Sequence, residues 1–371
     1  MASAALDVVE LEVSYGPVRV LKQVSLAVAA GEFVALLGSS GCGKTTLLRA
    51  ISGFVSVAAG RIGVSGRDIT HLPPDKRGMA MVFQSYALWP HMTTAQIIGY
   101  GLRLRKVPKP EIAERVRAIL AMLKLEGLGE RMVTQLSGGQ RQRVALGRAL
   151  AINPEILLLD EPLSNLDARI REEVRHEIKA LQHKLGITTI HVTHDREEAM
   201  VMADRIVILD AGQIAQVGAP EEVYNRPTST FVAAFMGAGN AIALDVRPAG
   251  NGLAIAAGAH NSALGIAASD LGPGLDAGHS GPVVAHFRGE AARLGPVDGP
   301  GQAWPSDHLV LTGRIVQASY PGGHYRYAVA VGDRQFMVDD AQRLSVGDAV
   351  GIGLPVHALH LFPADPQKPG G

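Results

Sequence analysis

The chain has 371 residues, 47% of them hydrophobic, which is enough for two domains with substantial cores. Lysine plus arginine and aspartate plus glutamate balance at 35 each, so no global charge recruits nucleic acid or an anionic membrane. The single cysteine, Cys42, excludes an internal disulfide and fits a reducing cytoplasm. The sequence has no apparent signal peptide and no apolar run of about 20 residues, so we expect other subunits to do any membrane spanning.

The first predicted elements are two antiparallel strands, over residues 7–14 and 18–30, joined near Gly16 and Pro17. Their recurring valines and leucines are typical of strands. Tyr15 lies at the turn. An aromatic residue there either packs over the hairpin, which is the more ordinary role, or stacks on a base.

A glycine-rich loop follows the apolar strand at residues 33–37 and precedes a helical pattern, which is the context of a phosphate-binding loop. Glycines let backbone N–H groups approach phosphate oxygens, and the helix N-terminus adds partial positive charge. We expect Lys44 to reach the β- and γ-phosphates and Thr45 to hold Mg²⁺, whereas Cys42 fills a small space rather than acting as a catalytic thiol. The loop comprises Gly38, Ser39, Ser40, Gly41, Cys42, Gly43, Lys44, Thr45 and Thr46.

Strands are next predicted over residues 60–64 and 79–83, the second ending at Gln84. Residues 85–94 are too rich in proline and aromatic side chains for a regular element. We interpret them as a surface loop whose apolar tips either form a local cluster or receive a partner.

A helix is predicted with Pro110 in its first turn and Gly127 as its stop. A second helix begins after Leu136-Ser137-Gly138-Gly139-Gln140, with Ser137 as the expected N-cap. Its glycine-flanked N-terminus is open to an anion, although alone such a stretch is usually only a turn and a cap.

The apolar run at residues 156–159 ends abruptly in Asp160 and Glu161. A strand that is apolar on both faces belongs inside a parallel sheet covered by helices, and nucleotide chemistry takes place at the carboxyl ends of such strands. We therefore expect Asp160 to hold the Mg²⁺ shell and Glu161 to orient or deprotonate the attacking water.

A helix is predicted over residues 167–186 and a strand over residues 188–192, shortly before His194. Asp195 and Glu198 have the spacing of a capping box for the next helix. On this pattern alone, structural and functional roles for His194 are equally supported.

The last part of the chain changes character. Residues 203–217 indicate a hairpin and residues 220–224 a short helix, and from about Gly237 glycine and proline rise while short strands recur. This indicates a small β-barrel or sandwich, with the weakest pattern at residues 240–282 and a frayed tail at 363–371. The recurring strands are at 283–287, 309–318, 325–331, 335–338, 349–354 and 358–362.

Together these motifs resemble the ATP-binding subunits of ABC transporters, over roughly residues 7–237. The Ser-Gly-Gly-Gln element distinguishes this family from kinases, GTPases and recombinases. The match rests on the phosphate loop, Gln84, Leu136 to Gln140, Ile156 to Glu161, Ser164-Asn165-Leu166-Asp167 and His194. The resemblance implies an α/β P-loop ATPase domain over 1–237, with an antiparallel β subdomain and a helical subdomain, and an all-β OB-like regulatory domain over 238–371.

The resemblance also assigns roles to single residues. Tyr15 would stack on adenine, Gln84 would sense Mg²⁺ or water, and His194 would clamp the γ-phosphate beside Glu161. ATP and Mg²⁺ are the implied cofactors, with Thr45, Gln84 and Asp160 around the metal.

Family members form head-to-tail dimers, and this accounts for the second glycine-rich element. Ser137 and Gly139, with Gly138 and Gln140 beside them, would reach the γ-phosphate held by Lys44 of the other subunit. Asp167 and its counterpart would lie between the two chains. ATP would close the dimer, and hydrolysis would open it.

The β-rich C-terminal part is similar to that of binding-protein-dependent importers, closest to the iron(III), polyamine and phosphonate branch. The implied partners are a second copy of the chain, a membrane permease seated near residues 85–92 and, indirectly, a solute-binding protein, at the cytoplasmic face of the inner membrane. Two alternatives stay open. One is a soluble ATPase of the same superfamily with a non-transport partner, and the other is a C-terminal domain that acts chiefly as a ligand sensor.

Overall fold

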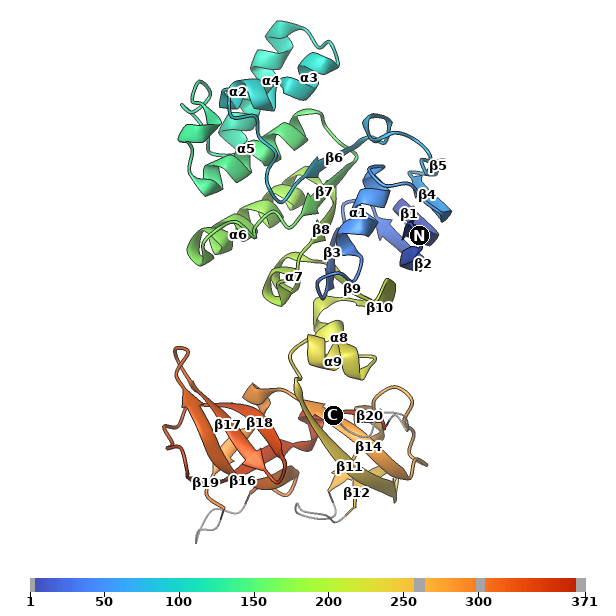
Figure 1. Ribbon diagram of the computed structural model, residues 1–371, viewed down its shortest axis with the longest axis vertical. Helices are drawn as coiled ribbons and strands as arrows, with labels where there is room; N and C mark the ends of the chain where they lie inside the picture. The colour runs from blue at the N-terminus through green and yellow to red at the C-terminus, as the bar shows by residue number, and fades with distance from the viewer. Residues whose placement is uncertain (1–3, 257–263, 298–303, 365–371) are drawn as a thin grey trace. The chain divides into compact units, whose positions relative to one another are not determined.

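The computed structural model describes residues 4–256, 264–297 and 304–364. They fall into two compact units, Met1–Pro220 and Glu221–Gly371, each described here by itself (Figure 1). The division lies before the sequence-based boundary at 237/238, which stays a prediction. Most of the expected tail at 363–371 lies outside the described residues.

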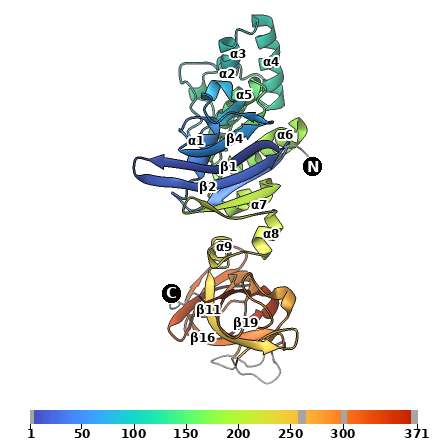
Figure 2. The ribbon, with the colours of Figure 1, turned by 90° about the vertical axis from the view of Figure 1, so that its right-hand side faces the viewer.

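The first unit contains an antiparallel sheet in the order β2-β1-β4-β5. Figure 2 shows β1 and β2 as a long hairpin, as the sequence predicts. Alternation along β1, with a register shift between Val8 and Leu11, buries Leu6, Val8, Leu11 and Val13. The strands are β1 (Ala4–Tyr15), β2 (Val18–Ala29), β4 (Ala59–Val64) and β5 (Arg67–Asp68).

A six-stranded sheet in the order β10-β9-β3-β8-β7-β6 forms the centre of this unit. Its strands pair in parallel except at the β9–β10 hairpin. Because helices cover both faces, with α1 on one side and α6 and α7 on the other, β3, β7 and β8 are buried along their whole length (Figure 1). The strands are β3 (Phe33–Gly38), β6 (Met79–Val82), β7 (Ile156–Asp160), β8 (Thr188–Val192), β9 (Arg205–Asp210) and β10 (Gln213–Gly218).

The helices of the first unit agree with the sequence pattern except at two places. The α4 helix ends at Met122 and not near Gly127, because Lys124 takes a left-handed φ of 54° that ends the helical run. The five-residue helices α2 and α3 are too short to produce a visible period and were not predicted. The remaining helices of the first unit are α1, α5, α6 and α7.

The helices of the described chain are α1 (Lys44–Ser52), α2 (Thr94–Ile98), α3 (Tyr100–Leu104), α4 (Lys109–Met122), α5 (Gly138–Ala151), α6 (Ala168–Leu185), α7 (Arg196–Met202), α8 (Pro220–Asn225) and α9 (Thr230–Phe235). None of them is both long enough and apolar enough to cross a membrane.

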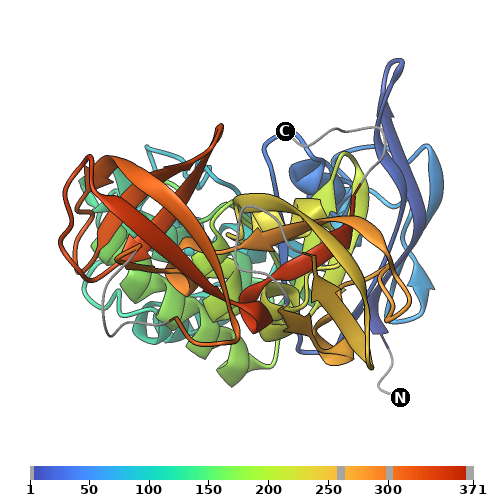
Figure 3. The same cartoon turned by 90° about the horizontal axis from the view of Figure 1, so that it is seen from below.

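The second unit holds two five-stranded antiparallel sheets, in the orders β13-β12-β11-β14-β20 and β15-β19-β16-β17-β18 (Figure 3). Both sheets contribute to one apolar core that includes Phe287, Tyr327 and Phe336, which confirms the expected all-β domain. The strands are β11 (Asn240–Ala249), β12 (Gly252–Ile255), β13 (Gly265–Ile266), β14 (Gly281–Phe287), β15 (Arg293–Gly295), β16 (His308–Ser319), β17 (Tyr325–Val331), β18 (Arg334–Asp340), β19 (Ala349–Pro355) and β20 (His360–Pro363).

Candidate functional site

The phosphate loop leads from β3 into α1. Gly43 is the N-cap of α1 with a φ of 109°, and no side chain caps this helix. The first N–H groups of α1 therefore keep no side-chain partner, which is the arrangement that an anion can use. The Lys44 ammonium is buried and donates hydrogen bonds to the carbonyl oxygens of Gly38 at 2.7 Å and Ser39 at 2.9 Å.

Two glycines of the loop are required by space. A Cβ on Gly38 would lie 2.4 Å from the Leu209 carbonyl oxygen, and one on Gly43 would lie 2.8 Å from Leu21 Cδ2. The other predicted loop residues occupy three settings. Ser39, Ser40 and Gly41 are exposed, Cys42 is buried, and Thr45 and Thr46 lie half-buried in the first turn of α1.

A hydroxyl and a carboxylate meet at the start of α1. The Thr45 Oγ1 hydroxyl donates to Oδ1 of Asp160 at 3.2 Å, and Asp160 is the last residue of β7. Burial raises the pKa of the Asp160 carboxyl, and the Thr45 hydrogen bond partly opposes that rise. The pair thus places a buried, costly carboxylate directly beside the phosphate loop.

The Glu161 carboxylate contacts two residues that are distant in sequence. It follows β7 with a left-handed φ of 45°, and its N–H donates to the Val192 carbonyl at the end of β8. Its Oε2 accepts a hydrogen bond from Gln84 Nε2 at 3.3 Å and lies 3.2 Å from His194 Nδ1. The three residues predicted to be catalytic therefore meet on one carboxylate oxygen.

Two residues hold Gln84 in this position. Asn165 Nδ2 donates to the Gln84 carbonyl oxygen at 2.7 Å, and the Gln84 side-chain amide also donates to Ser164 Oγ at 3.3 Å. The sequence placed Ser164 and Asn165 in a family motif but gave them no role at the site. Their position shortly after Glu161 is the signal that would have suggested one.

A buried hydrogen-bond network around Glu198 lies next to His194 in the chain. Asp195 caps α7 as predicted, but Glu198 does not complete a capping box. The Glu198 carboxylate instead accepts from Thr193 Oγ1 at 2.7 Å and lies 3.3 Å from His191 Nε2. Burial raises the pKa of Glu198, but the hydrogen bonds from His191 and Thr193 outweigh it and leave the pKa lowered. Glu198 is buried, so it prefers these partners to the exposed helix end.

The C-terminus of α1 is held by a residue that the sequence did not single out. The buried Arg77 guanidinium donates to four carbonyl oxygens, at 2.8–2.9 Å each. Two of these carbonyls, on Ala50 and Ile51, belong to the last turn of α1. A Cβ on the neighbouring Gly53 would lie 2.5 Å from Arg77 Nε, so only glycine leaves room for this contact.

The remaining predicted site residues stand apart from this cluster. Ser137 caps α5 and forms a reciprocal capping box with Gln140, and Asp167 caps α6. Tyr15 is 48% exposed at the β1–β2 turn. Within the described parts of the chain, no hydrogen bond recorded in the structure joins these residues, or Gly138 and Gly139, to the phosphate loop.

The chain is similar to families and proteins that are already known. The family model described as ABC transporter matches residues 21–164, and the model described as TOBE domain matches residues 288–362. The sn-glycerol-3-phosphate import ATP-binding protein UgpC 1 of Rhizobium johnstonii is 40% identical over 365 residues, 98% of this chain and 95% of that protein. UgpC of Brucella abortus is 53% identical over 238 residues, 64% of this chain and 67% of that protein.

A solved structure also resembles the chain. CbiO1 from Clostridium perfringens, part of the ABC transporter complex cbiONQ, aligns with a TM-score of 0.56 and 31% identity, covering 60% of this chain and 90% of that one. The chain belongs to the ATP-binding subunits of binding-protein-dependent ABC importers, and its activity is ATP hydrolysis coupled to transport.

Proposed function

We propose that Glu161 orients or deprotonates the water that attacks the γ-phosphate of ATP. The observation that carries this proposal is the contact of Gln84 and His194 with one Glu161 oxygen, next to the Thr45–Asp160 pair. A carboxylate held by two neutral or cationic partners is oriented before substrate arrives. With ATP in the loop, Lys44 exchanges its two carbonyl partners for the β- and γ-phosphates, and His194 contacts the γ-phosphate.

The same cluster suits Mg²⁺. Among the described residues, no three His, Cys, Asp or Glu side chains form a ready-made metal cage. The Thr45 hydroxyl, the Asp160 carboxylate and the Gln84 amide oxygen are hard ligands, which Mg²⁺ takes in small number together with phosphate oxygens and water. We assign the metal to these three residues, where it would neutralise charge on the phosphates.

The complete site is proposed to need two chains. The isolated chain holds Ser137 and Gly139 at the start of α5 without a recorded hydrogen bond to the loop. A head-to-tail homodimer would place them on the γ-phosphate bound by Lys44 of the other copy, with Asp167 between the chains. Tyr15, exposed at the β1–β2 turn, is the residue we assign to the adenine ring.

A groove in the first unit is the proposed seat of a permease helix. Its walls include Phe83, Tyr100 and Arg148, and Phe54 at its rim is 54% exposed. Exposed aromatic side chains around an apolar groove suit an inserted helix. Such contact with the permease, whose partner is an external solute-binding protein, would hold the chain at the cytoplasmic face of the inner membrane.

For the solute, we propose sn-glycerol 3-phosphate, because it is the solute named for the relatives. Iron(III), polyamine and phosphonate, which the sequence favoured, find no support among these relatives. The ATP-binding chain does not itself contact the solute, so this part of the proposal rests on relatedness alone.

Reconstitution tests the function as a whole. The tagged chain is used to purify its permease from the native membrane, and uptake of radiolabelled sn-glycerol 3-phosphate is measured in vesicles that contain the complex. We expect ATP-dependent uptake with the wild-type chain. Glu161→Gln should bind ATP normally but hydrolyse it at least about 100-fold more slowly and support no uptake. Wild-type turnover in Glu161→Gln would contradict the assignment of Glu161.

The domain boundary at 237/238 is also a proposal. It is supported by the separate apolar core of the β-rich unit. A chain that ends after Gly237 should bind ATP with an affinity within about threefold of the full chain, measured by calorimetry. Loss of nucleotide binding in this shorter chain, with its helical content intact, would refute the boundary.

A further inference from the structure

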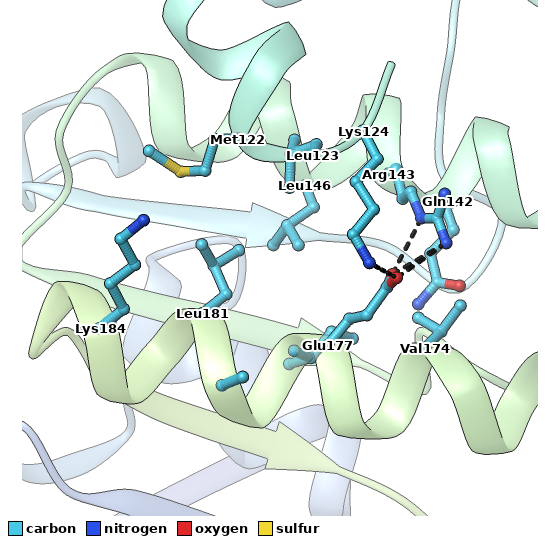
Figure 4. Close-up of a pocket in the computed structure, with 12 residues that line it drawn as sticks. Met122, Leu123, Lys124, Gln142, Arg143, Leu146, Val174, Glu177, Leu181 and Lys184 are labelled. Carbon is cyan, nitrogen blue, oxygen red and sulfur yellow. Dashed lines mark hydrogen bonds and ion pairs between the residues drawn. The ribbon is translucent and has the colours of Figure 1, made fainter. Parts of the chain in front are cut away.

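A second cavity lies where the helical part of the first unit meets α6, away from the residues assigned to ATP. It has a volume of about 230 Å³ and is lined from α4, α5, α6 and the segment after α4 (Figure 4). Its walls are apolar, formed by Leu123, Leu146, Val174, Ile178 and Leu181. None of these side chains forms a hydrogen bond or ion pair with the Glu161 cluster. The proposed ATPase function therefore assigns no ligand to this cavity.

Gln142 gives the cavity an unsatisfied polar group. This side chain is only 2% exposed, yet neither its Nε2 nor its Oε1 has a hydrogen-bond partner. A buried amide without partners costs free energy, and native structures rarely keep one without a reason. In Figure 4 the Gln142 amide lies among the lining residues beside Val174. An occupant of the cavity that hydrogen-bonds to Gln142 would remove this cost.

The polar groups at the rim carry excess positive charge. Lys124 and Arg143 both pair with the single carboxylate of Glu177, at 3.1 Å and 2.9 Å. Lys184 has no ion pair among the described residues and lies at the opposite end of the lining from Gln142 (Figure 4). Beside Gln142, two cations thus share one carboxylate, and this imbalance favours an anionic group at that end of the apolar cavity.

We propose that this cavity binds a small monocarboxylate with an apolar tail of about eight carbons. A cavity of about 150 Å³ accommodates benzene. In proportion, the volume of about 230 Å³ accommodates about nine or ten non-hydrogen atoms. The tail packs against the leucines, the carboxylate accepts a hydrogen bond from Gln142 Nε2, and Lys124 and Arg143 at the same end of the cavity neutralise its charge.

The location gives such a ligand a means to act on the ATPase. Gln142 and Leu146 are on α5, the helix that begins at Ser137, whereas Val174 and Leu181 are on α6, the helix that Asp167 caps. An acid in the cavity contacts both helices at once and resists any change in their separation. The binding test below does not depend on this effect or on the proposed transport function.

Calorimetric titration of the nucleotide-free full chain with octanoate tests the proposal. We expect one site per chain with a Kd on the order of 1 mM or tighter, typical of a ligand with about ten non-hydrogen atoms. Butyrate lacks the tail and octanamide lacks the charge, so each should bind at least about fivefold more weakly. Octanamide that binds as tightly as octanoate would overturn the proposal, as would the absence of any octanoate binding.

Variants locate the site. Leu181→Trp fills the cavity and should abolish octanoate binding, while Gln142→Leu and Lys124→Ala should each weaken it at least about threefold. Lys109→Ala, at an exposed lysine at the start of α4, is the matched control and should leave the Kd unchanged. Retained ATP binding shows that each variant is folded. If Leu181→Trp does not fold, Gln142→Leu tests whether octanoate binds in this cavity. Unchanged octanoate binding in Gln142→Leu would place the acid elsewhere and refute the assignment.

Discussion

The two glycine-rich helix starts of the first unit, at α1 and α5, differ in how their ends are satisfied. At α1 the N-cap is Gly43, in a left-handed conformation and without any side-chain cap. At α5 the N-cap is Ser137, whose Oγ accepts from the Gln140 N–H at 3.3 Å while the Gln140 side chain accepts from the Ser137 N–H at 3.0 Å. One end is left open to an anion, and the other is partly satisfied within its own chain.

In the proposed site, the two helix ends would contact the same phosphate in different ways. The α1 end can surround phosphate oxygens with free N–H groups as soon as a nucleotide arrives. The α5 end has less to offer in isolation, because its capping box already occupies two of the groups involved. It can therefore add to a phosphate that is already bound, which suits a contribution made across a dimer interface.

The largest effect is expected from closing the open end. Gly43→Ala places a side chain at a φ of 109°, which strains the backbone, and its Cβ lies 2.8 Å from Leu21 Cδ2, so that either Leu21 or the loop must shift. We expect ATP affinity to fall at least about tenfold, because the strain costs about 1–3 kcal/mol and also misplaces the N–H groups. Calorimetric ATP titration of the isolated chain measures this.

The matched substitution at the other helix is Gly138→Ala. The first residue of α5 has no left-handed φ, and its added Cβ would meet Leu166 at an ordinary 3.4 Å. ATP affinity of the isolated chain should therefore stay within about threefold of wild type. Equal losses in Gly43→Ala and Gly138→Ala would contradict the distinction between the two helix ends.

A moderate effect is expected in mixed dimers, which show whether the two ends meet across chains. Lys44→Ala in one chain and Ser137→Ala in the other leaves one intact site if the ends pair between chains. Both changes in the same chain, beside a wild-type partner, leave none. We expect ATP hydrolysis by the first mixture to be about tenfold faster than by the second. This factor corresponds to the free energy of one hydrogen bond to a charged group. The opposite order would indicate pairing within a chain.

The smallest effect concerns the buried carboxylate beside the open end. Burial raises the pKa of Asp160 in the folded chain, so the folded state binds protons more readily than the unfolded state there and is less stable as pH rises above the usual range of an aspartate. Asp160→Asn removes this cost. We expect the melting temperature at pH 7 to rise by about 2 °C without nucleotide.

The control for Asp160→Asn is its pH dependence. Since the gain comes from the ionised carboxylate, the difference between variant and wild type should shrink as pH falls toward 4. Scanning calorimetry at several pH values measures it, and MgATP affinity should fall in the same variant. A gain in melting temperature that is independent of pH would show that the Asp160 charge is not its cause.

Much of the first unit follows from local sequence. The phosphate loop lies where strand, glycines and helix follow one another, and β7 is recognisable as a continuous apolar run that belongs inside a parallel sheet. Ser137 and Asp167 are caps because their side chains bond to N–H groups three residues away, a distance that sequence spacing reveals.

Contacts between distant segments could not be predicted in this way. The meeting of Gln84 with Glu161, the four carbonyls around Arg77 and the unpartnered amide of Gln142 all depend on packing of segments far apart in the chain. Glu198 shows the limit most clearly, because its spacing fits a capping box but burial diverts it to Thr193. In the second unit, β11 and β12 were missed because alanine and glycine give little alternation.

Arg77 has a consequence for how energy leaves the site. Its buried cation lies against the carbonyl end of α1, and in the proposed site the triphosphate charge would lie at the amide end, so that the helix dipole would be balanced at both ends. Loss of the terminal phosphate would change the charge at one end only, while Arg77 would still hold the other. The movement that follows hydrolysis would then occur at Gln84, His194 and the surfaces of the proposed dimer, and α1 would keep its position.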